Sequence, residues 1–194
     1  KIIIVAGDPN SINSEIIYKS WKRTDNKTKK KLYLIGNYNL ILKQFKKLNY
    51  KTNIVKVNSV NDSIKSTNLK IINISLNFKN PFKVGLRSSS SYVIKCLNLA
   101  HSLAINKKVK GIINCPIDKK LIKVSKKVGV TEFFASKCKV KKSSEIMLIH
   151  NKKFSVVPLT THLDIKKVSK NITYELIINK ITSLNKEFKN VFKI

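Results

Sequence analysis

A run of polar side chains at the end of an apolar segment is the clearest candidate for chemistry in this chain of 194 residues. Residues 156–159 are apolar, and Thr160, Thr161 and His162 follow them directly. In α/β proteins, reactive side chains are placed in this way at the carboxyl end of a strand. A histidine in this position can ligate a metal, act as a general base or play a structural role. The structural role is the commonest of the three, so the histidine alone does not identify a function.

Other apolar runs also end in polar groups, at Asp8, at Asp118 with Lys119, and at Thr131 with Glu132. In an open α/β sheet, such strand ends converge on one edge, where ligands bind. Lysine and threonine suit a phosphate group, while histidine suits a divalent metal or proton transfer. The pattern therefore predicts an enzyme that acts on a small molecule.

The sequence does not contain a complete catalytic or metal-binding set. It has five glycines and no Gly-x-Gly-x-x-Gly fingerprint, which excludes a standard Rossmann phosphate loop. A metal centre at His162 needs two or three further ligands. We expect His101 inside a helix and His150 in a turn, so neither is an obvious second ligand. The four serines at residues 88–91 could bind phosphate, but we interpret them as a helix cap or linker.

The elements that must position these groups alternate between strands and helices. The expected strands are residues 2–6, 32–36, 51–57, 69–76 and 110–115, followed by a hairpin or two adjacent strands at 146–149 and 154–159. The expected helices are residues 14–21, 37–48, 92–106, a helix from 129 onward, and 172–192. Ser14 and Asn37 are the predicted N-caps of the first two helices, and residues 22–31 form a polar connection. This alternation predicts an α/β fold with a largely parallel sheet, without an internal repeat or a clear domain linker.

The net charge of +30 arises from 40 lysines and arginines against 10 acidic residues. The lysines are spread along the whole chain, arginine occurs only at Arg23 and Arg87, and the aromatic residues are not interleaved with the basic ones. We interpret this pattern as a solvated lysine surface without specific nucleic-acid recognition. A basic nucleic-acid-binding module remains an alternative function that rests on this charge. The charge should also attract anionic ligands.

The cysteine pattern and the apolar runs predict a cytoplasmic protein that does not enter a membrane. Cys96, Cys115 and Cys138 are widely spaced and show neither a disulfide framework nor a metal-ligand spacing, which fits a reducing compartment. No apolar run approaches the roughly 20 residues of a membrane-spanning helix. The first seven residues are typical of a buried strand and too short for a signal peptide.

Five motifs, in order and at similar spacing, resemble those of the 4-hydroxythreonine-4-phosphate dehydrogenases of pyridoxal phosphate biosynthesis. The motifs are Gly7-Asp8-Pro9 with Ser14-Glu15-Ile16, Pro116-Ile117-Asp118-Lys119, Gly129-Val130-Thr131-Glu132-Phe133, Ile146-Met147-Leu148, and Thr160-Thr161-His162 before the helix start at Ile172-Thr173. The resemblance covers essentially the whole chain. It implies a three-layer α/β/α fold like that of isocitrate and isopropylmalate dehydrogenases, of which residues 1–194 would be an incomplete, N-terminal part.

The resemblance also implies an activity and a set of partners. The family oxidises 4-phosphooxy-L-threonine, a small phosphorylated amino acid, with NAD or NADP, and decarboxylation then gives 3-amino-2-oxopropyl phosphate. It works as a homodimer with a divalent metal, which could be Zn, Mg or Co and acts as a Lewis acid. By resemblance, His162 is a metal ligand and Thr131 contacts substrate. Val130 occupies the family's histidine position, so one substrate contact would be lost.

Two further departures from the family pattern bear on activity. Residues 10–13 replace the family's Ala-Gly-Ile-Gly, which changes the backbone freedom of the first turn. The chain ends at Ile194, before the family's Asn-Pro-His-Ala-Gly-Glu and Tyr-His-Asp-Gln segments, which carry the other two metal histidines, and before most of the nucleotide site. We expect either a fragment of a longer protein or a shortened homologue. A non-catalytic homologue that keeps the fold and dimerises is the first alternative function.

Overall fold

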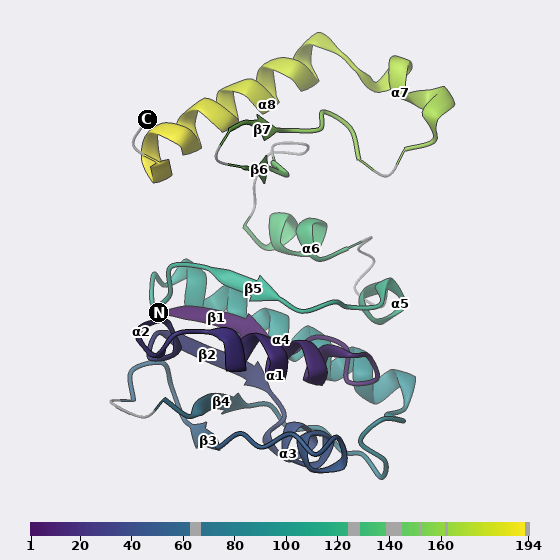
Figure 1. The fold of residues 1–194 in the computed structure, drawn as a ribbon. Coiled ribbons are helices and arrows are strands. Elements are labelled where there is room, and N and C mark those ends of the chain that lie inside the picture. The colour runs from purple at the N-terminus through teal and green to yellow at the C-terminus, as the bar shows by residue number, and fades with distance from the viewer. Residues whose placement is uncertain (63–66, 124–128, 139–144, 152, 162, 193–194) are drawn as a thin grey trace. The chain divides into compact units, whose positions relative to one another are not determined.

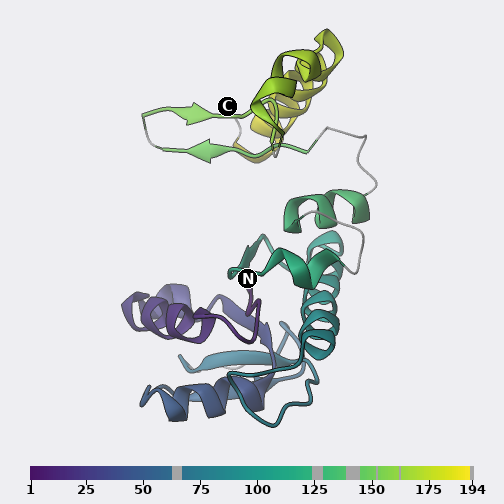
Figure 2. The same ribbon diagram turned by 90° about the vertical axis from the view of Figure 1, so that its right-hand side faces the viewer.

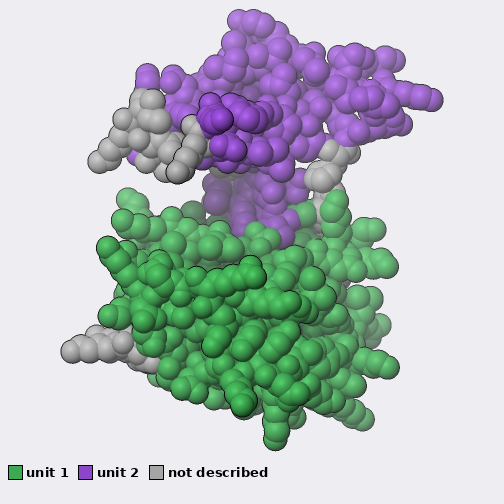
Figure 3. Space-filling model, viewed as in Figure 1, with its two compact units in different colours: residues 1–129 green, residues 130–194 purple. Residues whose placement is uncertain are grey.

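The computed structural model describes residues 1–62, 67–123, 129–138, 145–151, 153–161 and 163–192. The chain divides into two compact units, Lys1–Gly129 and Val130–Ile194 (Figure 3). The resemblance implies that residues 1–194 are an incomplete, N-terminal part of one dehydrogenase, and this stays a prediction.

The first unit is built around a five-stranded sheet with the order β3-β4-β2-β1-β5 (Figure 1). Its strands are β1 (Ile2–Val5), β2 (Leu32–Gly36), β3 (Ile54–Val57), β4 (Leu69–Asn73) and β5 (Ile112–Asn114). Every neighbouring pair is parallel. The predicted α/β fold with a parallel sheet is therefore confirmed, and the five strands lie within the predicted ranges.

Helices cover both faces of this sheet. The helices of the first unit are α1 (Asn13–Arg23), α2 (Asn26–Lys29), α3 (Tyr38–Lys47), α4 (Leu86–Ile105) and α5 (Lys119–Ile122). α1 and α3 pack on one face, and α4 contacts β1 and β2 from the other (Figure 2). The result is the predicted three-layer α/β/α arrangement.

Burial on both faces explains the apolar runs in the sequence. All five residues of β2 are buried, which is why its sequence is continuously apolar and does not alternate. Leu32 and Leu34 belong to a core cluster with Trp21 of α1 and Phe45 of α3. Because side chains alternate along a strand, the intervening β2 residues face the α4 layer.

Several helix starts differ from the prediction. Ser14 is not the N-cap of α1: the helix begins at Asn13, the capping position is Ile12, and Ser14 is buried in the first turn. α4 begins at Leu86, so the four serines lie inside its first two turns and do not precede it. By contrast, the predicted cap at Asn37 is confirmed, because its side chain accepts from the backbone N–H of Leu40 at 2.8 Å.

Helix α2 was predicted as part of a polar connection. Asp25 is its N-cap and accepts from the backbone N–H of Thr28 at 2.8 Å. A helix of four residues without a buried side chain has no apolar period, so the pattern that identifies longer helices does not reveal it.

The second unit contains a short hairpin and several helices. Its elements are α6 (Val130–Lys137), β6 (Ile149–His150), β7 (Ser155–Val156), α7 (Ile165–Asn171), α8 (Tyr174–Glu187) and the π-helix η2 (Phe188–Phe192). β6 and β7 are antiparallel, which confirms the predicted hairpin, although each strand is only two residues long. His150 was expected in a turn but lies in β6, where its Nδ1 is 2.8 Å from the Oγ of Ser155.

No helix in the described part of the chain combines the length and apolar character that crossing a membrane requires.

Candidate functional site

The turns that follow β1 and β5 lie side by side at the carboxyl edge of the sheet. The two strands are parallel neighbours, and the backbone N–H of Asp8 donates to the carbonyl of Pro116 at 3.3 Å. The chain leaves β1 through α1 on one face, whereas α5, after β5, packs against α4 on the other. Connections that diverge in this way open a crevice, which is where ligands bind in open α/β sheets. The two predicted strand ends of the first unit therefore do meet at one edge.

Gly7 permits the close approach of these two turns. Its φ is +74°, a conformation that side-chain-bearing residues rarely adopt. A Cβ at this position would lie 2.6 Å from the Nδ2 of Asn13 and 2.6 Å from the carbonyl oxygen of Pro116. Backbone space and backbone conformation thus both require glycine here.

The buried side chain of Asn13 joins the two turns. Its Nδ2 lies 2.9 Å from the carbonyl of Ala6, 3.3 Å from that of Asp8 and 2.7 Å from that of Pro116. Asn13 takes the place of a glycine in the family motif quoted above. The departure therefore adds a cross-link between the β1 and β5 turns, besides removing the backbone freedom of a glycine.

Two further side chains fix the turn after β1. Gln44 of α3 is buried, and its Nε2 donates to the carbonyl of Pro9 at 2.9 Å and to that of Pro81 at 2.7 Å. The amide of Asn10 pairs with the backbone of Val84, donating at 2.8 Å and accepting at 2.7 Å. The turn is thereby tied both to α3 and to the segment that leads into α4.

The two carboxylates at this edge accept hydrogen bonds from backbone N–H groups of their own turns. Oδ1 of Asp8 accepts from the backbone N–H of Asn10 at 2.8 Å. Asp118 is the N-cap of α5 and accepts from the backbone N–H of Lys120 at 2.8 Å. Both groups therefore shape the turns, and Lys119 extends into solvent beside Asp118 as the cationic side chain of the predicted strand end.

The remaining predicted site residues belong to the second unit. Val130 and Thr131 begin α6, with Val130 half-buried and the Thr131 side chain exposed. Thr160 and Thr161 follow β7 without regular secondary structure, and Thr161 is exposed. His162 lies outside the described residues, so its predicted role as a metal ligand stays a prediction.

Within the described residues, no group of three or more His, Cys, Asp or Glu side chains comes together to hold a metal ion. His101 is in α4 of the first unit, as expected, and His150 is in β6 of the second. The described side chains therefore do not by themselves form the metal centre that the resemblance implies.

The buried cysteines are unsuited to nucleophilic catalysis. Burial raises the pKa of the Cys96 thiol to about 12 and that of the Cys115 thiol to about 11. Both groups therefore stay protonated at neutral pH, whereas the thiolate is the reactive form.

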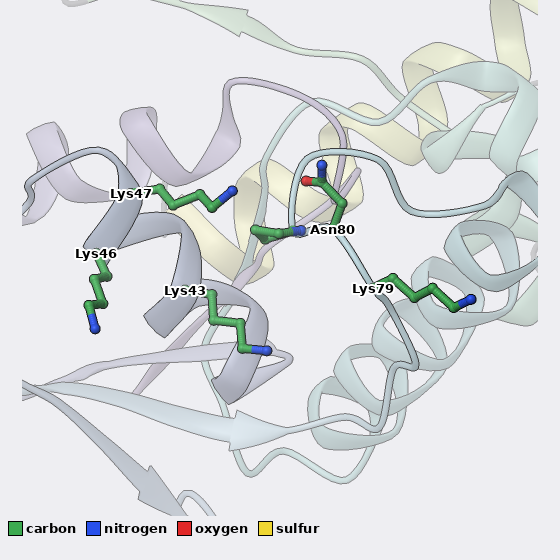
Figure 4. A pocket seen from close by; sticks show the side chains of 6 residues that line it. Lys43, Lys46, Lys47, Lys79 and Asn80 are labelled. Carbon is green, nitrogen blue, oxygen red and sulfur yellow. The ribbon is translucent and has the colours of Figure 1, made fainter.

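A lysine-rich hollow of about 530 Å³ lies on the α3 side of the first unit (Figure 4). It is lined by Lys43, Lys46, Lys47, Lys79, Asn80 and Pro81. The labelled lysines come from α3 and from the segment at Asn80, and they extend in different directions (Figure 4). Ammonium groups that splay apart in this way are typical of the solvated lysine surface predicted from the composition.

Sequence reasoning identified the turn at Gly7 and Asp8 but not the side chains that hold it. Gln44 lay inside a predicted helix and Asn13 directly before one, and nothing in their local sequence showed which distant carbonyls they bind. The one available signal was that Asn13 replaces a glycine of the family motif.

Comparisons with known proteins agree with the motifs. The sequence model of a family described as pyridoxal phosphate biosynthetic protein PdxA matches residues 27–194. The chain is 32% identical over 200 residues to the 4-hydroxythreonine-4-phosphate dehydrogenase of Sulfurihydrogenibium sp. (strain YO3AOP1), and 31% identical over 195 residues to that of Aquifex aeolicus (strain VF5). Each alignment covers 100% of this chain and 59% of the relative.

The fold is also shared with a solved structure. The 4-hydroxythreonine-4-phosphate dehydrogenase of Klebsiella pneumoniae superimposes with a TM-score of 0.85 over 98% of this chain and 58% of that chain, at 20% sequence identity. At this identity the likeness shows the fold alone. The chain thus spans 59% of the length of the two curated relatives named above.

Proposed function

Because the chain belongs to the PdxA family of pyridoxal phosphate biosynthetic proteins, we propose that the intact protein is a 4-hydroxythreonine-4-phosphate dehydrogenase. It oxidises the C3 hydroxyl of 4-phosphooxy-L-threonine with NAD or NADP and releases carbon dioxide to give 3-amino-2-oxopropyl phosphate. One observation of the structure carries most weight. The Gly7-Asp8-Pro9 and Pro116-Ile117-Asp118-Lys119 motifs, far apart in sequence, are held together by Asn13 at the carboxyl edge of a parallel sheet.

In this proposal, Thr131 binds the substrate. Its exposed hydroxyl lies in the first turn of α6, where helix N–H groups favour an anionic ligand. Val130 has no polar atom on its side chain, so it cannot make the contact that the family histidine makes. The nicotinamide cofactor, when bound, would accept the hydride, and the side chains of this chain would orient the substrate.

Steady-state kinetics of the intact protein test this role. NADH or NADPH formation should require 4-phosphooxy-L-threonine and a divalent metal. Thr131→Ala should lower kcat/KM by roughly tenfold, the loss expected for about 1.4 kcal/mol of transition-state binding. Thr67→Ala, at an exposed position before β4, is the matched control and should leave kcat/KM unchanged. The proposal fails if neither cofactor is reduced with Zn, Mg or Co present.

The Val130→His substitution tests the missing contact by adding a side chain, whereas Thr131→Ala removes one. It restores the family residue at the start of α6 and should lower KM for the phosphorylated substrate. An unchanged or higher KM would show that position 130 does not face substrate in this protein.

We propose that His162 ligates the divalent metal, on the basis of the Thr-Thr-His motif. The test is metal content. His162→Gln in the intact protein should lower the metal bound per chain after dialysis, while His101→Gln, in α4, should not. Equal metal content in the two variants would contradict the assignment.

We also propose that the protein is a homodimer, as the family implies. The second unit exposes many large apolar side chains, which favours covering by another protein surface. They are Met147, Ile149, Phe154, Val156, Leu163, Ile165, Ile172, Tyr174, Ile178 and Ile181. In sedimentation, Phe154→Asp should shift a dimer toward monomer, whereas Ile105→Asp, at the exposed end of α4 in the first unit, should not.

The two alternative functions have less support. A non-catalytic homologue is not favoured, since the relatives in the comparison are named as dehydrogenases. A basic nucleic-acid-binding module rests on charge alone. It predicts sequence-selective binding that survives at moderate salt, whereas purely electrostatic binding disappears there.

A further inference from the structure

A second hollow of the first unit, of about 360 Å³, lies between the segment after β4 and one side of α4. It is lined by Ser75, Leu76, Asn77, Arg87, Ser88, Ser91, Tyr92 and Lys95. The α4 members recur at intervals of three or four residues, which places them along the same side of the helix. The hollow is therefore one continuous groove along α4.

The four consecutive serines of α4 divide into two structural and two solvent-facing residues. Ser89 and Ser90 are buried, and their hydroxyls donate to the carbonyls of Val84 at 3.3 Å and Leu121 at 2.5 Å. Ser88 and Ser91 are exposed and line the groove. Helical geometry thus leaves the second pair at the surface, among the residues that line the groove.

The charged groups of the groove are both cationic. Arg87 and Lys95 are exposed, and no Asp or Glu is among the lining residues. Among the described residues, the side chains of Arg87, Ser88, Ser91 and Lys95 form no ion pair and no side-chain hydrogen bond. A guanidinium, an ammonium and two hydroxyls are all donors, and the guanidinium fork matches the oxygens of a phosphate group.

The floor of the groove is fixed to the carboxyl edge of the sheet. Tyr92 is fully buried, and its hydroxyl accepts from the backbone N–H of Asn37, directly after β2, at 3.0 Å. The side chain of Asn37 in turn donates to the carbonyl of Ile74, directly after β4, at 2.7 Å. The groove therefore lies where the β2 and β4 strands end, the edge at which ligands bind in such sheets.

From this arrangement we propose that the groove formed by Arg87, Ser88, Ser91 and Lys95 binds the phosphate group of a small ligand. The shared chemistry is a phosphate ester or diphosphate, which could come from a phosphorylated amino acid or from a dinucleotide. Arg87 and Lys95 neutralise its charge, and Ser88 and Ser91 donate hydrogen bonds to its oxygens. The choice of these two sources rests on the proposed function, whereas the binding of inorganic phosphate by the groove is measured without turnover.

The test compares two charge-matched double variants of the intact protein by calorimetric titration with inorganic phosphate at constant ionic strength. Arg87→Gln with Lys95→Gln should weaken phosphate binding at least tenfold. Lys43→Gln with Lys46→Gln removes the same two charges from the lysine-rich hollow of Figure 4 and should change binding less than twofold. Equal losses in both pairs, or no phosphate binding by the unsubstituted protein, would overturn the proposal.

The hydroxyls and the source of the phosphate are tested separately. Ser88→Ala with Ser91→Ala should weaken phosphate binding severalfold without any change of charge, and Ser20→Ala, on an exposed side of α1, should not. Phosphothreonine and NAD are then titrated in turn. The ligand whose affinity falls in the Arg87→Gln, Lys95→Gln variant identifies the source, and unchanged affinity for both would count against the groove as a functional site.

Discussion

The side-chain amide of Asn13 donates a hydrogen bond of 2.7 Å to the backbone carbonyl of Pro116, a residue 103 positions later in the chain. This bond closes the turns after β1 and β5 onto one another. It stands at the edge of the sheet where two of the family motifs meet, so the local geometry of this edge depends on a residue that the family motif does not contain.

Asn13→Asp should destabilise the protein more than Asn13→Ala. The alanine variant leaves the surrounding carbonyls without a donor and should cost about 1–3 kcal/mol. The aspartate places a carboxylate against the same carbonyl oxygens, which adds repulsion. Urea unfolding monitored by circular dichroism measures both free energies. Asn39→Asp, exposed on α3, controls for the charge and should have little effect; a milder effect for Asn13→Asp than for Asn13→Ala would refute the geometry.

Gly7→Ala should destabilise the same edge by about 1–3 kcal/mol, because the added Cβ meets both Asn13 and Pro116 at 2.6 Å and φ is +74°. Gly111→Ala is the matched control, since an added Cβ there has nothing within 4 Å. The midpoint temperature of thermal unfolding should be clearly lower for Gly7→Ala than for Gly111→Ala. If both lower the midpoint equally, the close approach of the two turns is not what constrains Gly7.

Lys70 of β4 is completely buried. No other lysine in the described strands of the first unit is buried. The Nζ of Lys70 donates to the carbonyl of Lys30 at 2.7 Å and lies 4.3 Å from the centre of the Tyr33 ring, and burial lowers its pKa. Lys70→Ala removes both the donor and the packed stem, so it should cost about 2–4 kcal/mol. Lys56→Ala, exposed on neighbouring β3, should stay within about 0.5 kcal/mol in the same denaturation experiment.

The buried Cys96 thiol should make the protein less stable at alkaline pH. Its pKa is raised by burial from 9.0 to about 12, so the unfolded chain loses the thiol proton first. The contribution of the thiol is fully present below pH 9 and falls as pH rises toward 12, by up to about 1.4 kcal/mol per pH unit. Cys96→Ala should therefore show a shallower loss of unfolding free energy over that window. Cys138→Ala, at an exposed position, should retain the slope of the unsubstituted protein.

The class of fold can be read from the order of residues alone, because burial leaves a direct trace in it. A strand covered by helices on both faces, such as β2, is read as a continuous apolar run, and that run is visible without a structure. The Asn37 cap was equally accessible, because its bond reaches only three residues along the chain. The family motifs, which need only their order and spacing, were also readable, although the roles of Thr131 and His162 remain predictions.

Which side chains hold the edge of the sheet, and which face solvent there, depends on how distant parts of the chain fold together. The Pro116 acceptor of Asn13 is 103 residues away and the acceptors of Gln44 are 35 and 37 residues away, so no local period encodes these pairs. Likewise, four identical serines acquire two different roles because α4 begins at Leu86 and its 3.6-residue turn buries only Ser89 and Ser90. A sequence pattern records which residues are buried, whereas the hydrogen-bond partner of a polar side chain depends on how distant segments meet in space.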